Sequence, residues 1–230
     1  MDSPSSTAHE PNVWSRVDDY INERLIPQDS VLREILYNNR RANLPDYDVT
    51  PAQGKLLNLM VRMQGARRIL EIGTLGAYST VWMARALPEE GRIITLELDP
   101  RHAAVAKANL ALAGVDHRVE VREGDAPLQL ANMVNEGEAP FDMIFIDADK
   151  PNNPVYLQYA LQLSRPGTLI IGDNVIRDGQ IIHEHHPDPR VQGVQQFFDM
   201  LAQSNRITAT AIQTVGSKGY DGFMIGIVNS

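Results

Sequence analysis

The sequence predicts an α/β protein built on a mainly parallel sheet with helices on both faces. From residue 68 onward, short apolar runs alternate with segments that have helical periodicity. Apolar strands that alternate with helices are typical of a parallel sheet covered on both faces. The last two apolar runs, 207–213 and 222–228, are separated by too few residues for a crossover helix. They therefore predict a hairpin that makes one edge of a seven-stranded sheet antiparallel.

The segment before the sheet predicts a tail and three helices. Residues 1–12 are polar and rich in proline and serine, which is typical of a mobile tail. Apolar residues recur at helical spacing over residues 13–39, and Pro27 is expected to divide this stretch into two helices. Thr50 followed by Pro51 has the pattern of an N-cap with proline at the first helical position, opening a helix to about residue 63.

The remaining elements follow in regular alternation. The predicted strands before the hairpin are 68–72, 92–97, 119–121, 141–146 and 168–171. The predicted helices are 79–86, 101–113, 126–135, 154–163 and 192–203. With no internal repeat and no second core, residues 13–230 are expected to form a single domain.

Composition narrows the class of protein. The chain has 230 residues, of which 43% are hydrophobic and 22% charged, as in ordinary globular domains. The net charge of −8 counts against a nucleic-acid binder, which needs a basic surface. The absence of cysteine excludes disulfides and thiolate catalysis. No apolar run approaches the roughly 20 residues of a membrane span, and no secretory signal is expected, so we expect a cytoplasmic protein.

A glycine-rich turn follows the first strand. Glu71-Ile72-Gly73-Thr74-Leu75-Gly76 lies where the strand meets a helix, and glycine there lets the backbone approach a ligand closely. The second glycine comes too early for the full dinucleotide pattern, which counts against NAD and FAD. Glu97 ends the next strand, where a carboxylate can accept hydrogen bonds from ribose hydroxyls; the alternative is a solvated carboxylate. Together the two features favour a nucleoside cofactor.

The third strand is followed by Gly124-Asp125-Ala126. This segment is typical of a loop along the edge of an adenine. An ordinary Asp N-cap of the following helix is nearly as good an explanation, and the two roles are compatible.

Acidic residues end the fourth and fifth strands. Asp147-Ala148-Asp149-Lys150 follows one strand and Asp173-Asn174 the next. Because these strands are expected to be neighbours, their two carboxylates and one amide can converge on Mg²⁺ or Ca²⁺. Either segment alone is also explained as a helix cap, but both together with Lys150 favour a metal site.

Three histidines, His183, His185 and His186, lie in a proline-containing loop. A His-rich tract can bind metal. A solvated loop is the commoner explanation, and we assign these residues no catalytic role.

These motifs resemble those of the cation-dependent O-methyltransferases that use S-adenosylmethionine, the group that includes caffeoyl-CoA and catechol O-methyltransferases. The resemblance rests on the turn after Leu70, on Phe145-Ile146-Asp147-Ala148-Asp149-Lys150 and on Gly172-Asp173-Asn174, and it extends from about Val49 to the C-terminus. It implies a class I methyltransferase fold, a homodimer and a small hydroxylated aromatic acceptor.

The resemblance also implies roles for individual residues. The implied catalytic residues are Lys150 and Asp147. Lys150 lies near the reacting hydroxyl, where it either takes the phenolic proton or stabilises the anion. The implied cofactor-binding residues are Val49, Glu71, Gly73, Ser79, Glu97, Asp125, Ala126, Asp147 and Asp149. The implied ligands of a divalent cation, Mg²⁺ first with Ca²⁺ or Mn²⁺ as alternatives, are Asp147, Asp173 and Asn174.

One departure affects the acceptor. Plant caffeoyl-CoA enzymes carry an aromatic residue shortly after the Asp-Asn pair, whereas this chain has Val175-Ile176-Arg177. Arg177 then either meets a carboxylate or phosphate of the acceptor or is a surface arginine. The alternatives in function are a tRNA-modifying methyltransferase on the same fold, which the acidic net charge disfavours, and a non-catalytic cofactor-binding dimer.

Overall fold

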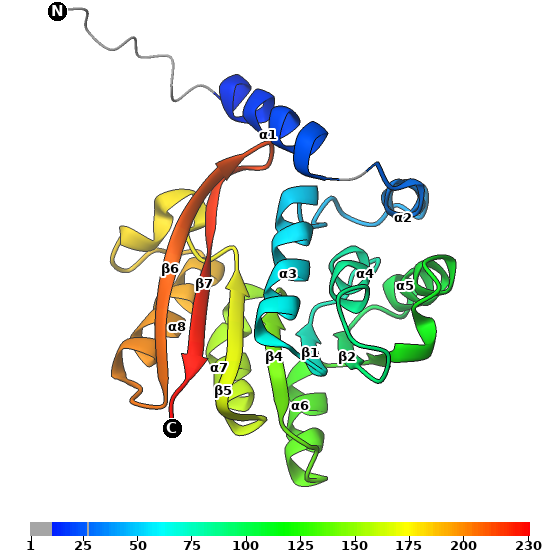
Figure 1. The fold of residues 1–230 in the computed structure, drawn as a ribbon. Helices are drawn as coiled ribbons and strands as arrows, with labels where there is room; N and C mark the ends of the chain where they lie inside the picture. The colour runs from blue at the N-terminus through cyan, green and yellow to red at the C-terminus, as the bar shows by residue number, and fades with distance from the viewer. Residues whose placement is uncertain (1–10, 27) are drawn as a thin grey trace, which may run out of the picture.

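Seven strands form one sheet in the order β3-β2-β1-β4-β5-β7-β6. The computed structural model describes residues 11–26 and 28–230 (Figure 1). The strands from β3 to β5 pair in parallel, and β7 pairs antiparallel with both β5 and β6. The α/β class and the antiparallel edge predicted from the sequence are confirmed.

The elements follow the predicted alternation closely. The strands are β1 (Arg68–Ile72), β2 (Arg92–Glu97), β3 (Val119–Glu123), β4 (Phe141–Ile146), β5 (Ser164–Asp173), β6 (Ile207–Gly216) and β7 (Gly219–Val228). The α-helices are α1 (Pro11–Leu25), α2 (Ser30–Arg41), α3 (Pro51–Gln64), α4 (Tyr78–Ala84), α5 (Pro100–Leu112), α6 (Ala126–Asn135), α7 (Asn153–Gln162) and α8 (Pro189–Gln203). Short 3₁₀ helices are η2 (Asp116–Arg118), η3 (Lys150–Asn152) and η4 (Arg177–Ile182). In the described part of the chain no helix is long and apolar enough to cross a membrane.

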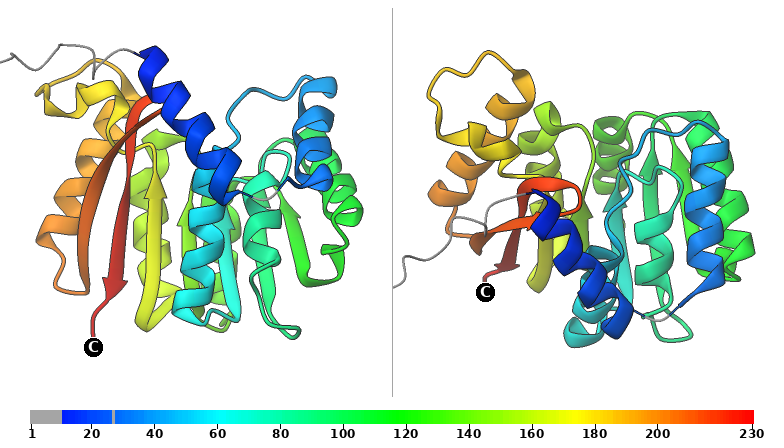
Figure 2. Two further views of the ribbon diagram at one scale, coloured as in Figure 1. Left: turned by 45° about the horizontal axis from the view of Figure 1, so that its top comes forward. Right: turned by 90° about the horizontal axis from the view of Figure 1, so that it is seen from above.

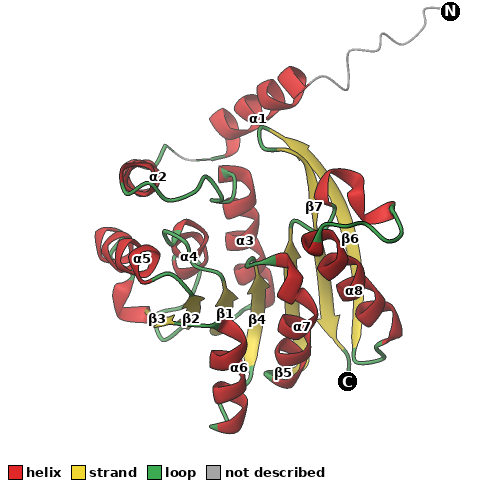
Figure 3. Ribbon diagram, turned by 180° about the vertical axis from the view of Figure 1, so that it is seen from behind, coloured by secondary structure: helices red, strands yellow, loops and turns green. Residues whose placement is uncertain are grey.

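Helices cover both faces of the sheet. Helices α3, α4 and α5 lie in front of it in Figure 1, and α6, α7 and α8 lie in front when it is seen from behind in Figure 3. Successive strand residues alternate between the two cores: Ile69 packs into the first and Leu70 into the second, and neither is exposed. Both faces are therefore apolar, which explains why the central strands read as continuous apolar runs.

The helix before the sheet begins as the sequence predicts. Thr50 caps α3 by accepting the backbone N–H of Gln53 at 3.2 Å, while Gln53 Oε1 accepts the N–H of Thr50 at 2.8 Å. Pro51 occupies the first turn, and Gly65 ends the helix in the left-handed region with φ of 63°. This reciprocal cap fixes where the chain enters α3, directly after Val49.

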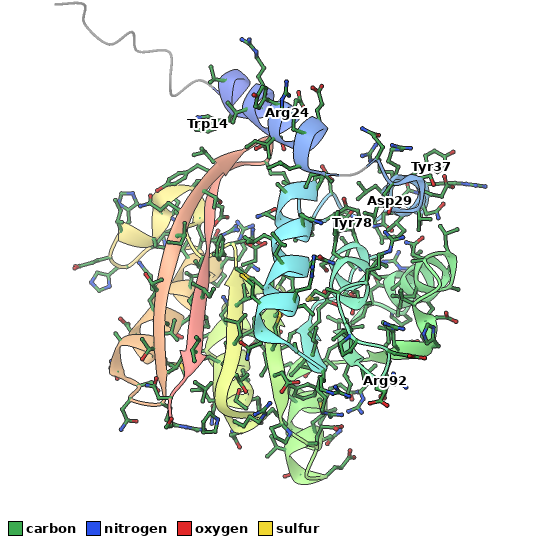
Figure 4. All side chains as sticks on the ribbon, in the orientation of Figure 1. Trp14, Arg24, Asp29, Tyr37, Tyr78 and Arg92 are labelled. Carbon is green, nitrogen blue, oxygen red and sulfur yellow. The ribbon has the colours of Figure 1, made fainter. Side chains whose placement is uncertain are left out.

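The N-terminal helices lie across one end of the molecule. Residues 1–10, which hold most of the predicted tail, and Pro27 lie outside the described residues, and α1 already begins at Pro11 rather than after residue 12. Helix α1 crosses the turn of the β6–β7 hairpin (Figure 2), where Asp18 Oδ2 accepts the N–H of Ser217 at 2.7 Å. Asp29, labelled in Figure 4, caps α2 and pairs with Arg85 at 2.6 Å. The predicted connection 214–221 is shorter than expected, because both hairpin strands extend into it.

Candidate active site

The carboxyl ends of three neighbouring strands bring the predicted motifs together. Ile146 is paired with Ile72 of β1 on one side and with Gly172 of β5 on the other. The next residues, Gly73, Asp147 and Asp173, therefore lie side by side at one edge of the sheet. Ligands of open α/β sheets bind at this edge.

Gly73 is required by the packing of the turn against β4. A Cβ at this position would lie 2.2 Å from the carbonyl oxygen of Asp147, and the φ of Gly73 is +99°. Leu75 and Ala77 of the same turn also have positive φ, of 50° and 66°. Left-handed backbone costs a residue with a side chain about 1–2 kcal/mol, so this turn needs support from elsewhere.

Glu97 supplies part of that support. Its Oε2 accepts the backbone N–H of Leu75 at 2.8 Å and that of Thr74 at 3.3 Å, and its Oε1 accepts the N–H of Asp99 at 2.9 Å. A carboxylate has about four acceptor positions, so room remains for a ribose hydroxyl. The sequence indicated the ribose role but not this hold on the glycine turn.

Glu71 lies beneath the turn and has no exposed surface. Ser79 donates to Oε1 at 2.6 Å, and Thr80 and Thr95 donate to Oε2 at 2.5 and 2.7 Å. Burial raises the pKa of Glu71 to about 7, against the lowering effect of these hydroxyls and with a further rise from the charge of Asp147. These three hydrogen bonds tie the end of β1 to the start of α4 and to β2.

A buried network of amides joins the turn to the N-terminal helices. Asn109 Nδ2 donates to Asn39 Oδ1 and to the carbonyl of Gly76, both at 2.9 Å, and Asn39 Nδ2 donates to Asp48 Oδ1 at 2.9 Å. Asn39 and Asn109 are 2% and 1% exposed. The network fixes α2, the turn and the residue before Val49 relative to one another. Sequence reasoning missed it; the one available signal was a polar residue among the apolar residues of helix 101–113.

Two carboxylates and a lysine form the acidic centre. Lys150 Nζ donates to Asp147 Oδ1 at 3.0 Å, and Lys150 and Asp173 are only 7% and 6% exposed. Burial raises the pKa of Asp173 to about 7; the charge of Asp147 adds to the rise and that of Lys150 opposes it. Asn174 is the next residue along the chain, with φ of 56°. The sequence predicts its amide as the third oxygen donor, with the carboxylates of Asp147 and Asp173.

The remaining predicted cofactor residues lie on several elements and are buried to different depths. Asp149 accepts the hydroxyl of Tyr156 and, at 2.7 Å, the amide of Asn152, which anchors η3; burial and the charge of Asp149 raise the pKa of Tyr156. Asp125 is the predicted N-cap of α6, accepting the N–H of Leu128 at 3.0 Å. Ala126, the first residue of α6, is half-buried. Val49 is buried and, with Asp173, lines a cavity of about 20 Å³ under α3.

Arg177 and the histidines lie outside the acidic centre. Arg177 Nη1 is 3.7 Å from Asp221 Oδ2, so its guanidinium faces a carboxylate of the protein itself. His183 and His185 are exposed, and His186 Nδ1 accepts the N–H of Asp188 at 3.1 Å. Across residues 11–26 and 28–230 no three His, Cys, Asp or Glu side chains have the arrangement of a metal site. The expected cation site therefore depends on an amide as its third donor.

Comparison with known proteins decides the family. A family model described as O-methyltransferase matches residues 23–222. The chain belongs to the O-methyltransferase family. A catechol O-methyltransferase from Niastella koreensis is 50% identical over 216 residues, which cover 94% of this chain and 98% of that relative.

Solved structures of other O-methyltransferases have the same fold. The O-methyltransferase from Bacillus cereus, solved in complex with SAH, has a TM-score of 0.94 at 55% identity, covering 96% of this chain and all of that one. An O-methyltransferase involved in tomaymycin synthesis in Streptomyces achromogenes, solved with SAM, has a TM-score of 0.93 at 48% identity, covering 96% and 99%. The class I methyltransferase fold and the methyl-transfer reaction class expected from the motifs are thereby confirmed.

Proposed function

We propose that this O-methyltransferase transfers the methyl group of S-adenosylmethionine to a hydroxyl of a catechol-type small molecule, with the help of a divalent cation. One observation carries the proposal. Asp147 and Asp173 end adjacent strands beside the buried ammonium of Lys150, next to the turn at Gly73. The relatives named as a catechol O-methyltransferase and as complexes with SAM or SAH support the cofactor and the acceptor class.

The donor set fits a hard cation. Asp147, Asp173 and Asn174 offer only oxygen donors, which Mg²⁺, Ca²⁺ and Mn²⁺ prefer over nitrogen and sulfur. Burial and the charge of Asp147 raise the pKa of Asp173, and the ammonium of Lys150 offsets only part of this rise. A bound divalent cation would supply charge that chelates two vicinal oxygens of the acceptor and lowers the pKa of its hydroxyl.

Lys150 has the position to handle the acceptor proton. Its side chain is buried and held by Asp147, so the ammonium cannot swing into solvent without breaking that bond. Helix α8 also packs tightly on its backbone, since a Cβ on Gly193 would lie 2.2 Å from the Lys150 carbonyl oxygen. The amine then takes the phenolic proton, or the ammonium stabilises the phenolate, while the methyl group passes from sulfur to oxygen and S-adenosylhomocysteine is left.

Measurement of methyl transfer with and without chelator tests the proposal. We expect the wild-type protein to methylate a catechol, to lose activity in excess EDTA and to regain it with Mg²⁺. Asp173→Asn should lower kcat at least about 100-fold while leaving the affinity for S-adenosylhomocysteine within about twofold. Asp142→Asn is the matched control. Asp142 is another buried carboxylate on β4, but it lies at the amino end of the strand, away from the proposed site. Full activity in EDTA refutes the role of the cation, and transfer to tRNA but not to catechols refutes the acceptor class.

Acceptor choice provides a separate test. A vicinal diol supplies two oxygens and the corresponding phenol only one, so kcat/KM should be far higher for the diol. Because Arg177 faces Asp221, we expect no strong preference for acidic catechols. Equal kcat/KM values for catechol and phenol would rule out chelation.

We also propose a homodimer. Helix α1 presents Val17, Ile21 and Leu25 at helical spacing, and they are 49%, 36% and 68% exposed. An apolar stripe of this kind is typical of an interaction surface. Light scattering on the purified protein should give twice the chain mass, and Ile21→Asp should shift it towards the monomer.

A further inference from the structure

The chain after Asp173 has an unfavourable backbone. Asn174, Arg177 and Asp178 have φ of 56°, 53° and 54°, which is the left-handed region that residues with side chains avoid. Asparagine and aspartate tolerate this region better than arginine does. Three such residues within five positions persist only if neighbouring groups hold the backbone in place.

Asp221, near the beginning of β7, holds this backbone in place. Its Oδ1 accepts the backbone N–H of Ile176 at 2.9 Å, of Arg177 at 3.1 Å and of Gly222 at 2.9 Å. Its Oδ2 lies 3.7 Å from Arg177 Nη1. Hydrogen bonds from N–H groups to an ionised carboxylate are stronger than those to a neutral acceptor.

The sheet pairing brings Asp221 to this place. Asp173 is paired with Phe223 in the antiparallel ladder, and just beyond it the N–H of Val175 donates to the carbonyl of Gly222 at 3.0 Å. Gly222 has no space for a side chain, since a Cβ would lie 2.2 Å from the carbonyl oxygen of Ile212. The residues after Asp173 are thus fastened to the Asp221-Gly222 pair on a different element.

We propose that Asp221 is a positioning residue that holds Asn174 and the segment to Arg177 in the geometry needed to bind the cation. This inference rests on the function proposed above. The Asp221 carboxylate is engaged by three backbone N–H groups and lies next to Arg177, so we assign it no role as a ligand. It acts through Oδ1, which holds the backbone N–H groups of Ile176 and Arg177 and so limits the positions open to Asn174, two residues before Ile176.

Two readouts on the acceptor-free protein test the role: titration with Mn²⁺ alone and hydrogen exchange of the backbone amides. Asp221→Ala should weaken Mn²⁺ binding at least about tenfold and speed exchange at Ile176 and Arg177. Asp221→Asn keeps an acceptor oxygen and should stay within about threefold of wild type. S-adenosylhomocysteine affinity should change less than about twofold in both variants.

Asp142→Ala is the control for general loss of stability. Asp142 Oδ2 likewise accepts two backbone N–H groups, of Arg67 and Arg68 at 2.8 and 2.9 Å, but at the other end of the strands. Its Mn²⁺ affinity should match wild type. If Asp221→Ala fails to fold, Asp221→Glu, which keeps the charge and displaces the oxygen, should still weaken Mn²⁺ binding about fivefold.

The outcomes separate the two proposals. Wild-type protein that binds no Mn²⁺ overturns the proposed function and this inference with it. Mn²⁺ binding by wild type that is equally tight in Asp221→Ala, or in Asp221→Glu where alanine does not fold, overturns the inference alone. Equal weakening in Asp142→Ala also overturns it, because the effect would then come from lost stability.

Discussion

Replacing Glu71 by Gln should change how the stability of the protein depends on pH. The Glu71 carboxyl has no exposed surface, and burial raises its pKa from the ordinary value of 4.5 to about 7. Between these two pH values the unfolded chain has released the proton while the folded chain still holds it. The free energy of unfolding must therefore fall as pH rises from about 4.5 to 7, and it must level off above 7.

The size of this effect follows from the two pKa values. Each pKa unit corresponds to about 1.4 kcal/mol, so the rise from 4.5 to about 7 predicts a loss of about 3 kcal/mol. Glutamine cannot ionise, so Glu71→Gln should lack this loss. The variant also replaces an acceptor of the Ser79, Thr80 and Thr95 hydroxyls, at a cost of about 1 kcal/mol that does not depend on pH.

Urea unfolding of both proteins between pH 4.5 and 8, in EDTA, measures the difference. We expect the stability of Glu71→Gln relative to wild type to rise by about 3 kcal/mol across this range. Asp173 titrates in the same window and is present in both proteins, so its contribution largely cancels in the difference. A pH-independent difference would show that Glu71 is already ionised in the folded protein, and the account of its burial would be wrong.

Three further substitutions test the two sides of the site. Gly73→Ala should lower the free energy of unfolding by about 2 kcal/mol or more, because the new Cβ clashes with the Asp147 carbonyl and the backbone is strained. Gly65→Ala is the control: its φ is also positive, but the space around it is open, so it should lose only about 1 kcal/mol in the same urea experiment. Asn109→Ala should weaken S-adenosylmethionine binding in calorimetry, because the Gly76 carbonyl loses its buried donor; unchanged affinity would show that the amide network does not shape the cofactor turn. Lys150→Met should lower kcat about 100-fold or more with cofactor affinity within twofold. A variant whose pH–rate profile keeps the acidic limb of the wild type, where activity rises as the base loses its proton, would exclude Lys150 as the base.

Most of the fold was predictable because its signals are local. The bounds of β1, β2, β4 and α6 match the prediction, since each apolar run is set off by polar or glycine residues. The ends of β5 and of the hairpin strands were predicted too short. Arg165 and Pro166 within β5, and the exposed polar residues of the β6–β7 hairpin near Lys218, carry no apolar pattern. Those ends depend on pairing with a neighbouring strand, which a residue pattern does not record.

In the candidate site, the sequence predicted the charged residues that directly follow the strands. Asp147 and Asp173 were placed together because parallel strands end at one edge of the sheet. The supporting contacts of Asn109 and Asp221 were missed, because their partners are 33 and 44–45 residues away, on elements brought near only by the fold. Glu71 was predicted at the cofactor, but its hydroxyl partners on α4 and β2 could not be read from the sequence.

The cofactor side and the acceptor side of the proposed site are stabilised by different interactions, so substitutions on the two sides should have different effects. On the cofactor side, the buried carboxyl of Glu71 and the amide of Asn109 have partners within the protein. On the side that we propose for the acceptor, Lys150 donates to Asp147, and burial together with the charge of Asp147 raises the pKa of Asp173. The cation that we propose would relieve the repulsion between Asp147 and Asp173, and so would act only on the acceptor side. Substitutions at Asp173 or Asp221 should therefore alter metal binding and turnover but leave cofactor affinity nearly unchanged. Substitutions at Asn109 should alter cofactor binding but leave metal affinity nearly unchanged.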